Sequence, residues 1–232
     1  MSDPEVSVVV PCYNAERYVL STVRSLLAQG LGDRLEILVV DDGSRDASVQ
    51  RIRASGLPVR LLHQANAGVA AARNRGAAEA RGRLLAFCDA DDLWLPGKLA
   101  RQLAGLRRFP DARLASSGWH VWVSDDPEPP SWDAWLPACA PGMAAEHELT
   151  CDDRYPELLE DCVVWTSTVV MDRALFQEMG GFDTTLPVGE DYDLWLRCSR
   201  RTSIVMDRAS LALYRMHPAS ITKKPLARNF KG

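Results

Sequence analysis

Four short apolar runs, each closed by a turn or a breaker residue, constrain the fold of this chain more than any other feature. The runs lie at 6–10, 35–40, 59–62 and 84–88, and they have the length and aliphatic content of buried strands. Segments with apolar residues at helical spacing separate them, at 16–28, 46–54 and 69–80. Strands and helices that alternate in this way predict right-handed βαβ units. The expected fold is therefore an α/β domain with a mostly parallel central sheet flanked by helices.

Three polar clusters follow three of these predicted strands. They are Pro11–Asn14, Asp41–Ser44 and Asp89–Asp92. Ligands of open parallel sheets bind at the carboxyl ends of the strands. We therefore expect the three clusters to converge on one edge of the sheet and to form a single ligand site.

The second half of the chain is less regular and predicts a smaller elaboration of the same domain. Expected elements are helices at 99–109 and 190–200 and strands at 114–123 and 163–171. The segment 125–141 is rich in Pro, Asp and Trp and predicts a long irregular loop. We expect one domain over 1–222, divided into halves at about 1–110 and 111–222, and a basic tail at 223–232.

Composition argues against several classes of protein. A formal net charge of -4 is unlike that of a nucleic-acid-binding protein, which presents a basic face to the phosphates. No apolar stretch is long enough to span a bilayer, and the first residues lack the features of a signal peptide. The six cysteines form no CxxC pair and are expected to be reduced thiols. We expect a cytoplasmic protein that is at most peripheral on the inner face of a membrane.

The acidic turn Asp89–Asp92 is the sharpest candidate for a metal site. Its three carboxylates repel one another unless a cation or hydrogen-bond donors compensate. Oxygen ligands suit magnesium or manganese, which keep waters and bind substrate phosphates. A plainer interpretation is that Asp92 caps a helix beginning near Pro96. The position of the turn directly after a strand favours the metal site.

Two further acidic clusters are open to two interpretations each. Asp42 could accept hydrogen bonds from a base or a ribose, although Asp, Gly and Ser are also ordinary turn residues. Glu190 and Asp191 open a predicted helix, where the helix dipole favours carboxylates whatever their function. The same dipole favours an ionised Asp191, which a general base requires.

Aromatic and histidine side chains are less informative. Tryptophans gather in the irregular middle of the chain, at 119, 122, 132, 135 and 165. Exposed tryptophans can stack on a sugar or another acceptor, but burial in the core is their commoner role. His217 follows an apolar run, and chemistry alone does not single it out.

Six motifs occur in an order that resembles the large family 2 of inverting nucleotide-sugar glycosyltransferases, which have a GT-A type, Rossmann-like fold. They are VSVVVPCYNAERYV, VVDDGSRDAS, NAGVAAARNRGAAEARGRLLAFCDADDLW, GGFD, GEDYDLWLR and YRMHPASIT. The likeness runs from Val6 to about Thr222 and is weakest between about Asp111 and Tyr155. It implies that the first half binds the nucleotide sugar and that the second half binds the acceptor and supplies the base.

The resemblance also implies a role for each candidate residue. The positions that it places on the donor are Pro11, Tyr13, Asp42, Arg73, Asp89 and Asp92. Asp91 corresponds to the metal ligand of the family's DxD motif, and His217 to a histidine found on the metal or the diphosphate. The implied cofactor is a divalent cation, manganese or magnesium.

The implied reaction moves a sugar from a nucleoside-diphosphate sugar, expected to be UDP-linked, to an acceptor hydroxyl with inversion. Asp191 corresponds to the general base and Glu190 to its supporting partner. The acceptor would be a carbohydrate, a lipid-linked molecule or a protein, in polysaccharide, glycolipid or glycoconjugate biosynthesis. The chain lacks the QxxRW motif and the membrane spans of processive synthases.

Two other functions remain open at this point. A sugar-1-phosphate nucleotidyltransferase also uses a nucleotide and a metal, but it would place a Gly-rich phosphate loop where this chain has Pro11–Asn14. A non-catalytic nucleotide-sugar-binding protein of the same fold would tend to lose an acid, whereas Asp91 and Asp191 are both present.

Overall fold

The first four strands pair in parallel, as the alternation of strands and helices predicts. The computed structural model describes residues 3–126 and 149–218. Its first strands are β1 (Val6–Cys12), β2 (Leu35–Asp41), β3 (Arg60–His63) and β4 (Leu84–Phe87). The helices between them are α1 (Val19–Leu27), α2 (Ser48–Ser55) and α3 (Val69–Glu79), with a 3-10 turn η1 at Gly32–Arg34. β1 lies between β2 and β4, and β3 extends the sheet beyond β2.

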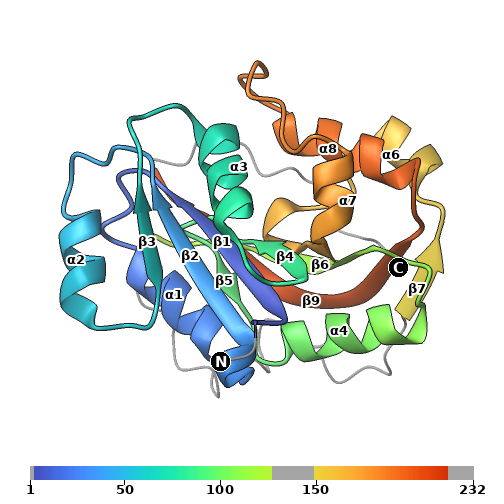
Figure 1. Ribbon diagram of the computed structural model, residues 1–232, viewed down its shortest axis with the longest axis horizontal. Helices are drawn as coiled ribbons and strands as arrows, with labels where there is room; N and C mark the ends of the chain where they lie inside the picture. Colours follow the sequence, from blue (N-terminus) through green and yellow to red (C-terminus); the bar gives the residue numbers. More distant parts are fainter. Residues whose placement is uncertain (1–2, 127–148, 219–232) are drawn as a thin grey trace.

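The rest of the chain continues the same sheet. Its strands are β5 (Leu93–Trp94), β6 (Leu114–Val123), β7 (Leu149–Asp152), β8 (Val170–Asp172) and β9 (Ile204–Met216). The order across the sheet is β3-β2-β1-β4-β8-β6-β9-β5, with β7 paired to β9 outside this path (Figure 1). β8 runs antiparallel to both β4 and β6, whereas the long pair β6 and β9 is parallel. The predicted mostly parallel α/β sheet is confirmed, and each of its antiparallel pairs includes one of the short strands β5, β7 and β8.

Helices cover both faces of the sheet. Those that follow β5 are α4 (Lys98–Arg108), α6 (Tyr155–Glu160), α7 (Arg173–Glu178) and α8 (Glu190–Ser199). Alternate residues of β1 point to opposite faces, as the pleat of a strand requires. Val9 belongs to the core shared with α3, α7 and α8, while Val8 and Val10 belong to the core shared with α1, α2 and α4. Figure 1 draws α3, α7 and α8 above the strands and α1 and α4 below them.

The expected strand at 163–171 is wrong in most of its length. Only Val170 and Met171 of that range lie in β8, and Thr166–Thr168 forms a 3-10 turn, η2. The hydroxyl of Thr168 donates to the carbonyl of Trp165 at 2.6 Å, and such local side-chain bonds compete with strand pairing. The sequence pattern also left β9 unassigned. The expected helix at 16–28 begins only at Val19.

Some expectations fall on residues that the structure does not describe. Of the predicted loop at 125–141, only Asp125 and Asp126 are described. Trp132, Trp135 and the basic tail at 223–232 lie outside the described residues. Within the described ranges, no helix has both the length and the apolar character needed to cross a bilayer.

A buried carboxylate ties the amino ends of the first strands together, at the opposite edge from the polar clusters. Glu36 accepts hydrogen bonds from the Ser7 hydroxyl at 2.6 Å, from Arg60 at 2.7 Å, and from the Arg81 backbone and guanidinium at 3.0 and 2.9 Å. Burial acts to raise the pKa of Glu36, but these hydrogen bonds outweigh it and lower the pKa to about 2. Glu36 therefore stabilises the fold as an ionised group.

Glu36→Gln is expected to lower the free energy of unfolding at pH 7 by on the order of 3 kcal/mol. The pKa of Glu36 in the folded protein lies below the ordinary glutamate value of 4.5, so this stabilisation is complete above pH 4.5 and is lost as the pH falls towards 2. Urea unfolding of the wild type and of Glu36→Gln between pH 7 and pH 3 should show that their difference in free energy of unfolding becomes smaller at low pH. Glu79→Gln, which removes a half-exposed partner of Arg60, is the control and should cost little. If the wild type and Glu36→Gln differed by the same free energy of unfolding at every pH, Glu36 would not stabilise the fold as an ionised group.

Candidate functional site

The three polar clusters lie together at the carboxyl ends of β1, β2 and β4. The backbone N–H of Asp42 donates to the carbonyl of Cys12 at 2.8 Å, and that of Asn14 donates to the Ser44 hydroxyl at 3.0 Å. The acidic turn follows the carboxyl end of β4, and β4 runs parallel to β1 as its direct neighbour. Segments far apart in the sequence therefore form one edge, as the strand pattern predicts.

Asp92 faces into the protein. Only 1% of its surface is exposed, and its carboxylate accepts from the Ser167 hydroxyl at 2.5 Å, the Arg215 backbone at 3.0 Å and the Trp165 indole at 3.3 Å. It does not cap a helix, because α4 begins at Lys98 and has Gly97 at its cap position. Asp92 thus anchors the acidic turn, and its predicted contact with a donor stays a prediction.

The acidic turn concentrates negative charge in a dry environment. Burial raises the pKa of Asp92 well above its ordinary value, and the carboxylates of Asp91 and Asp89 add to the effect. Burial likewise raises the pKa of Asp89, against the opposing influence of Arg73. Further positive charge would therefore be favoured at this turn.

Asp91, in the acidic turn, contacts His217. Oδ2 of Asp91 lies 3.1 Å from Nε2 of His217, and the two side chains are 30% and 10% exposed. β9 ends at Met216 and so delivers the histidine to this place, where its ring lies 4.6 Å from that of Tyr18. The guanidinium of Arg215 donates to the Asp91 carbonyl at 2.8 Å and fixes the turn against β9.

These residues fit a divalent cation whose coordination is completed by substrate. No group of three or more His, Cys, Asp or Glu side chains able to hold a metal occurs in the described part of the chain. A carboxylate oxygen and an imidazole nitrogen nevertheless converge at Asp91 and His217, and the carboxylate is a ligand type that suits magnesium or manganese. Cations bound through so few protein ligands take their remaining ligands from waters and substrate phosphates.

Arg73 joins the acidic turn to the first turn of α8. Its guanidinium lies 2.7 Å from Oδ1 of Asp89 and 2.7 Å from Oε1 of Glu190, and its side chain is only 4% exposed. Burial acts to lower the pKa of Arg73, but the carboxylates, Asp89 foremost, outweigh it and raise the pKa. One buried cation therefore holds the two acidic segments together.

Asp191 lies one residue further along α8 and is half-buried. Its Oδ2 accepts a hydrogen bond from the Thr166 hydroxyl at 2.6 Å, and its Oδ1 accepts one from the Tyr192 backbone at 2.8 Å. Each oxygen keeps a further lone pair for a ligand. The arrangement suits a group that accepts a proton from a bound hydroxyl.

The residues predicted to contact the nucleoside differ in exposure. Pro11 is buried within β1, whereas Tyr13, directly after the end of β1, is 48% exposed. The carboxylate of Asp42 accepts from Gln64 and from the backbone of Ala67 and Gly68, at 2.8 to 2.9 Å. It fixes the loop before α3, and its hydrogen bond to a base stays a prediction.

Trp119 and Trp165, two of the tryptophans that could stack on an acceptor or lie in the core, belong to one aromatic cluster. The Trp165 ring lies 6.0 Å from that of Trp119 and 4.4 Å from that of Tyr214. The Trp122 ring lies 4.1 Å from the guanidinium of Arg215. Their contact with an acceptor is not tested by these distances.

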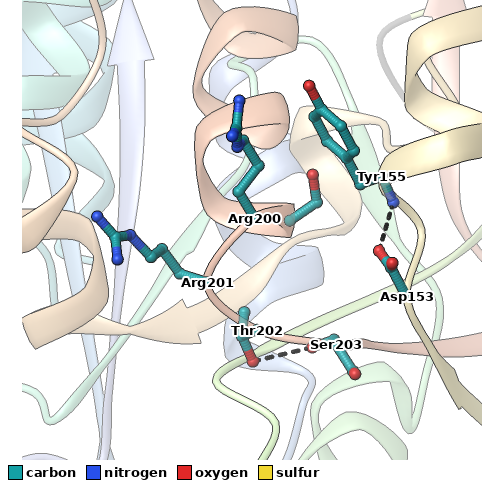
Figure 2. A pocket seen from close by; sticks show the side chains of 7 residues that line it. Asp153, Tyr155, Arg200, Arg201, Thr202 and Ser203 are labelled. Carbon is teal, nitrogen blue, oxygen red and sulfur yellow. Dashed lines mark hydrogen bonds between the residues drawn. The ribbon is translucent and has the colours of Figure 1, made fainter.

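A separate polar cavity of about 470 Å³ lies at the other end of α8 (Figure 2). Asp153, Tyr155 and Arg200 line part of it, and the Arg200 guanidinium lies 5.3 Å from the Tyr155 ring centre. Figure 2 shows Asp153 bonded to the backbone N–H of Tyr155 rather than directed at the cavity's arginines. None of the predicted site residues lines this cavity.

Sequence reasoning missed several residues that build the site. Thr166, Ser167 and Arg215 contact the acidic residues, yet none was singled out. Arg215 lies in the quoted YRMH motif, which was a usable signal. The Trp-Thr-Ser-Thr run at 165–168 could have suggested a hydroxyl-rich turn rather than a strand.

Comparison with known proteins gives consistent matches. A family model described as glycosyl transferase family 2 matches residues 7–145. The chain is 29% identical over 226 residues to the Escherichia coli protein named UDP-Glc:alpha-D-GlcNAc-diphosphoundecaprenol beta-1,3-glucosyltransferase WfgD, covering 96% of this chain and 81% of that protein. Uncharacterized glycosyltransferases of Rickettsia species match at 26% to 30% identity, and the chain spans only 32% to 67% of their length.

Two solved structures show the same fold. One is S. aureus TarS in complex with UDP, with a TM-score of 0.71 and 20% identity over 92% of this chain and 61% of that one. The other is the mannosyltransferase PcManGT from Pyrobaculum calidifontis in complex with GDP-Man and Mn2+, with a TM-score of 0.68 and 21% identity over 95% and 59%. The expected GT-A type fold is confirmed.

Proposed function

Because this chain belongs to glycosyl transferase family 2, we propose that it moves a sugar from a nucleoside-diphosphate sugar to an acceptor hydroxyl with inversion of configuration. One observation carries the proposal. Arg73 bridges Asp89 of the acidic turn and Glu190 beside Asp191, at 2.7 Å each. The segment suited to a diphosphate and the segment suited to proton abstraction therefore lie within reach of one substrate pair.

The proposed reaction is a single in-line displacement. Asp191 takes the proton from the acceptor hydroxyl as its oxygen bonds to the anomeric carbon. The bond from that carbon to the diphosphate breaks on the opposite face, and the electron pair leaves with the nucleoside diphosphate. One base suffices because no covalent glycosyl-enzyme forms, by analogy with inverting hydrolases. Glu190, paired with Arg73, keeps the start of α8 in place.

Asp91 and His217 are the residues that would hold a divalent cation, manganese or magnesium. When bound, the cation supplies Lewis-acid stabilisation of the charge that develops on the diphosphate. The Mn2+ named with PcManGT supports this assignment. The residues proposed to contact the donor are Pro11, Tyr13, Asp42, Arg73, Asp89 and Asp92, of which Tyr13 offers the most exposed surface.

A UDP-linked donor is favoured by two of the comparisons. TarS was solved with UDP, and the name of WfgD specifies UDP-Glc. The same name specifies a lipid-linked acceptor, so we propose a lipid-linked or other carbohydrate acceptor and a role in polysaccharide, glycolipid or glycoconjugate biosynthesis. A peripheral position at the inner face of a membrane would fit such an acceptor.

The two rival functions are less well supported. The segment after β1 holds no glycine-rich phosphate loop, which argues against a nucleotidyltransferase. Asp91 is partly exposed beside His217, and Asp191 keeps free lone pairs. A protein that only binds nucleotide sugars would not need a carboxylate such as Asp191 with lone pairs free to accept a proton.

The donor class is testable by a thermal-shift screen against UDP-, GDP- and dTDP-sugars, with and without manganese. We expect the largest rise in melting temperature with a UDP-sugar plus manganese, because a ligand that binds only the folded state stabilises it. No shift with any nucleotide sugar would contradict the proposed function.

The cation assignment predicts metal-dependent nucleotide binding. Calorimetric titration with UDP should give an affinity at least about tenfold higher with manganese than with EDTA, which corresponds to about 1.4 kcal/mol. Asp91→Asn should remove most of that difference, whereas Asp111→Asn, at an exposed position outside the site, should preserve it. Equal UDP affinity with manganese and with EDTA would show that the cation assignment is wrong.

A further inference from the structure

The 3-10 turn η2 contacts both acidic segments through adjacent residues. The Thr166 hydroxyl donates to Asp191 at 2.6 Å. The Ser167 hydroxyl donates to Asp92 at 2.5 Å and accepts from the backbone N–H of Asp89 at 3.0 Å. A single turn thus bonds the acidic turn on one side and the carboxylate of α8 on the other.

Buried side chains of β5 and α4 donate hydrogen bonds to the backbone carbonyls of η2. The Trp94 indole donates to the Ser167 carbonyl at 2.6 Å, and the Gln102 amide donates to the Thr168 carbonyl at 2.7 Å. Thr166, Ser167 and Thr168 are each at most 1% exposed. A turn whose carbonyls are held in this way by the neighbouring β5 and α4 has little freedom to shift relative to the sheet.

The Thr166 hydroxyl donates to a carboxylate rather than to a nearby backbone carbonyl. A buried threonine hydroxyl can satisfy itself by bonding a nearby backbone carbonyl, as Thr168 does with Trp165 at 2.6 Å. Thr166 instead bonds a half-buried carboxylate 25 residues further along the chain. Its single proton is thereby committed to one oxygen of Asp191, which restricts rotation of that carboxylate.

We propose that η2 positions the acidic turn and Asp191 as one unit, with Thr166 as the positioning residue that orients the Asp191 carboxylate for proton abstraction. The inference rests on the proposed function of Asp191. It assigns no chemical step to Thr166, which acts through Asp191. Loss of the hydroxyl should therefore slow the chemical step and leave donor binding in place.

The test compares Thr166→Val, which keeps the shape and removes the hydroxyl, with Thr166→Ser, which keeps the hydroxyl. Rates of UDP release are measured with UDP-glucose and manganese, or with the donor selected by the thermal-shift screen. We expect Thr166→Val to lower kcat by roughly ten- to a hundredfold, as misplaced catalytic groups do, with KM and UDP affinity within about twofold of wild type. Thr166→Ser should recover most of kcat.

Thr202→Val is the matched control, because Thr202 is a buried threonine whose hydroxyl bonds Ser203 and Arg113 away from the site. It should leave kcat near the wild-type value. If Thr166→Val does not fold, Thr166→Ala is measured in the same way.

Three results would overturn the inference. They are an unchanged kcat in Thr166→Val, an equal loss of kcat in Thr166→Ser, or a loss that falls on KM and UDP affinity alone. Failure of the proposed function looks different. In that case Asp191→Asn itself retains wild-type turnover, whatever the result at Thr166.

Discussion

Asp191→Asn is expected to lower the rate of UDP release from a donor sugar by on the order of a hundred- to ten-thousandfold, the usual contribution of a general base. Asparagine has nearly the same shape and can still accept the Thr166 hydrogen bond, but it cannot take a proton. Binding of UDP should stay within about twofold of wild type, because the acidic turn is untouched. Initial rates and calorimetric titration measure the two quantities separately.

Asp193→Asn is the matched control for this substitution. Asp193 lies in the same first turn of α8, where it pairs with Arg197 at 2.7 Å on the half-exposed surface. Pairs of this kind contribute about 0–1 kcal/mol, so the variant should keep near-normal stability and turnover. Near-normal turnover in Asp191→Asn would exclude Asp191 as the base.

Arg73→Met is expected to destabilise the fold and to abolish turnover together. Methionine fills much of the volume but leaves the carboxylates of Asp89 and Glu190 without the cation that lies 2.7 Å from each. Removing one partner of a buried ion pair typically costs about 3–5 kcal/mol. Urea unfolding at pH 7 measures the loss, and UDP titration shows whether the acidic turn still binds nucleotide.

Arg75→Met provides the comparison on the same helix. Arg75 is exposed on α3, so its replacement should change the free energy of unfolding by no more than about 0.5 kcal/mol. An Arg73→Met protein as stable as Arg75→Met would contradict the view that one buried cation joins the two acidic segments.

The parallel part of the fold was predictable because its strands are short and separated by helices, and β1, β2 and β4 are almost entirely buried, although β3 is only partly buried. β6 was predicted with its observed bounds, Leu114–Val123. The segment at 163–171 was not, because a run of valines and threonines has the composition of a strand whether or not it pairs. Its 3-10 turn depends on contacts with Trp94, Gln102 and Asp191, which no local pattern contains.

Some residues of the candidate site were also predictable from the sequence, and others were not. Asp42 and the acidic turn were proposed because they follow strands. Asp191 was proposed because it opens a predicted helix and its motif resembles a family, and His217 because of the resemblance alone. The Ser167 hydroxyl and the Arg215 backbone N–H bond Asp92, which lies 75 and 123 residues away from them in the sequence. No local sequence pattern identifies such distant partners, so the structure was needed to identify these contacts.

Product analysis with a panel of UDP-sugars tests the central claim most directly. The protein is incubated with each donor and manganese, and the nucleotides are separated by chromatography. The proposed function predicts that at least one donor yields UDP, at a rate that falls with EDTA and with Asp191→Asn. Donors left intact throughout, or pyrophosphate released from UTP and a sugar 1-phosphate without any formation of UDP, would contradict it.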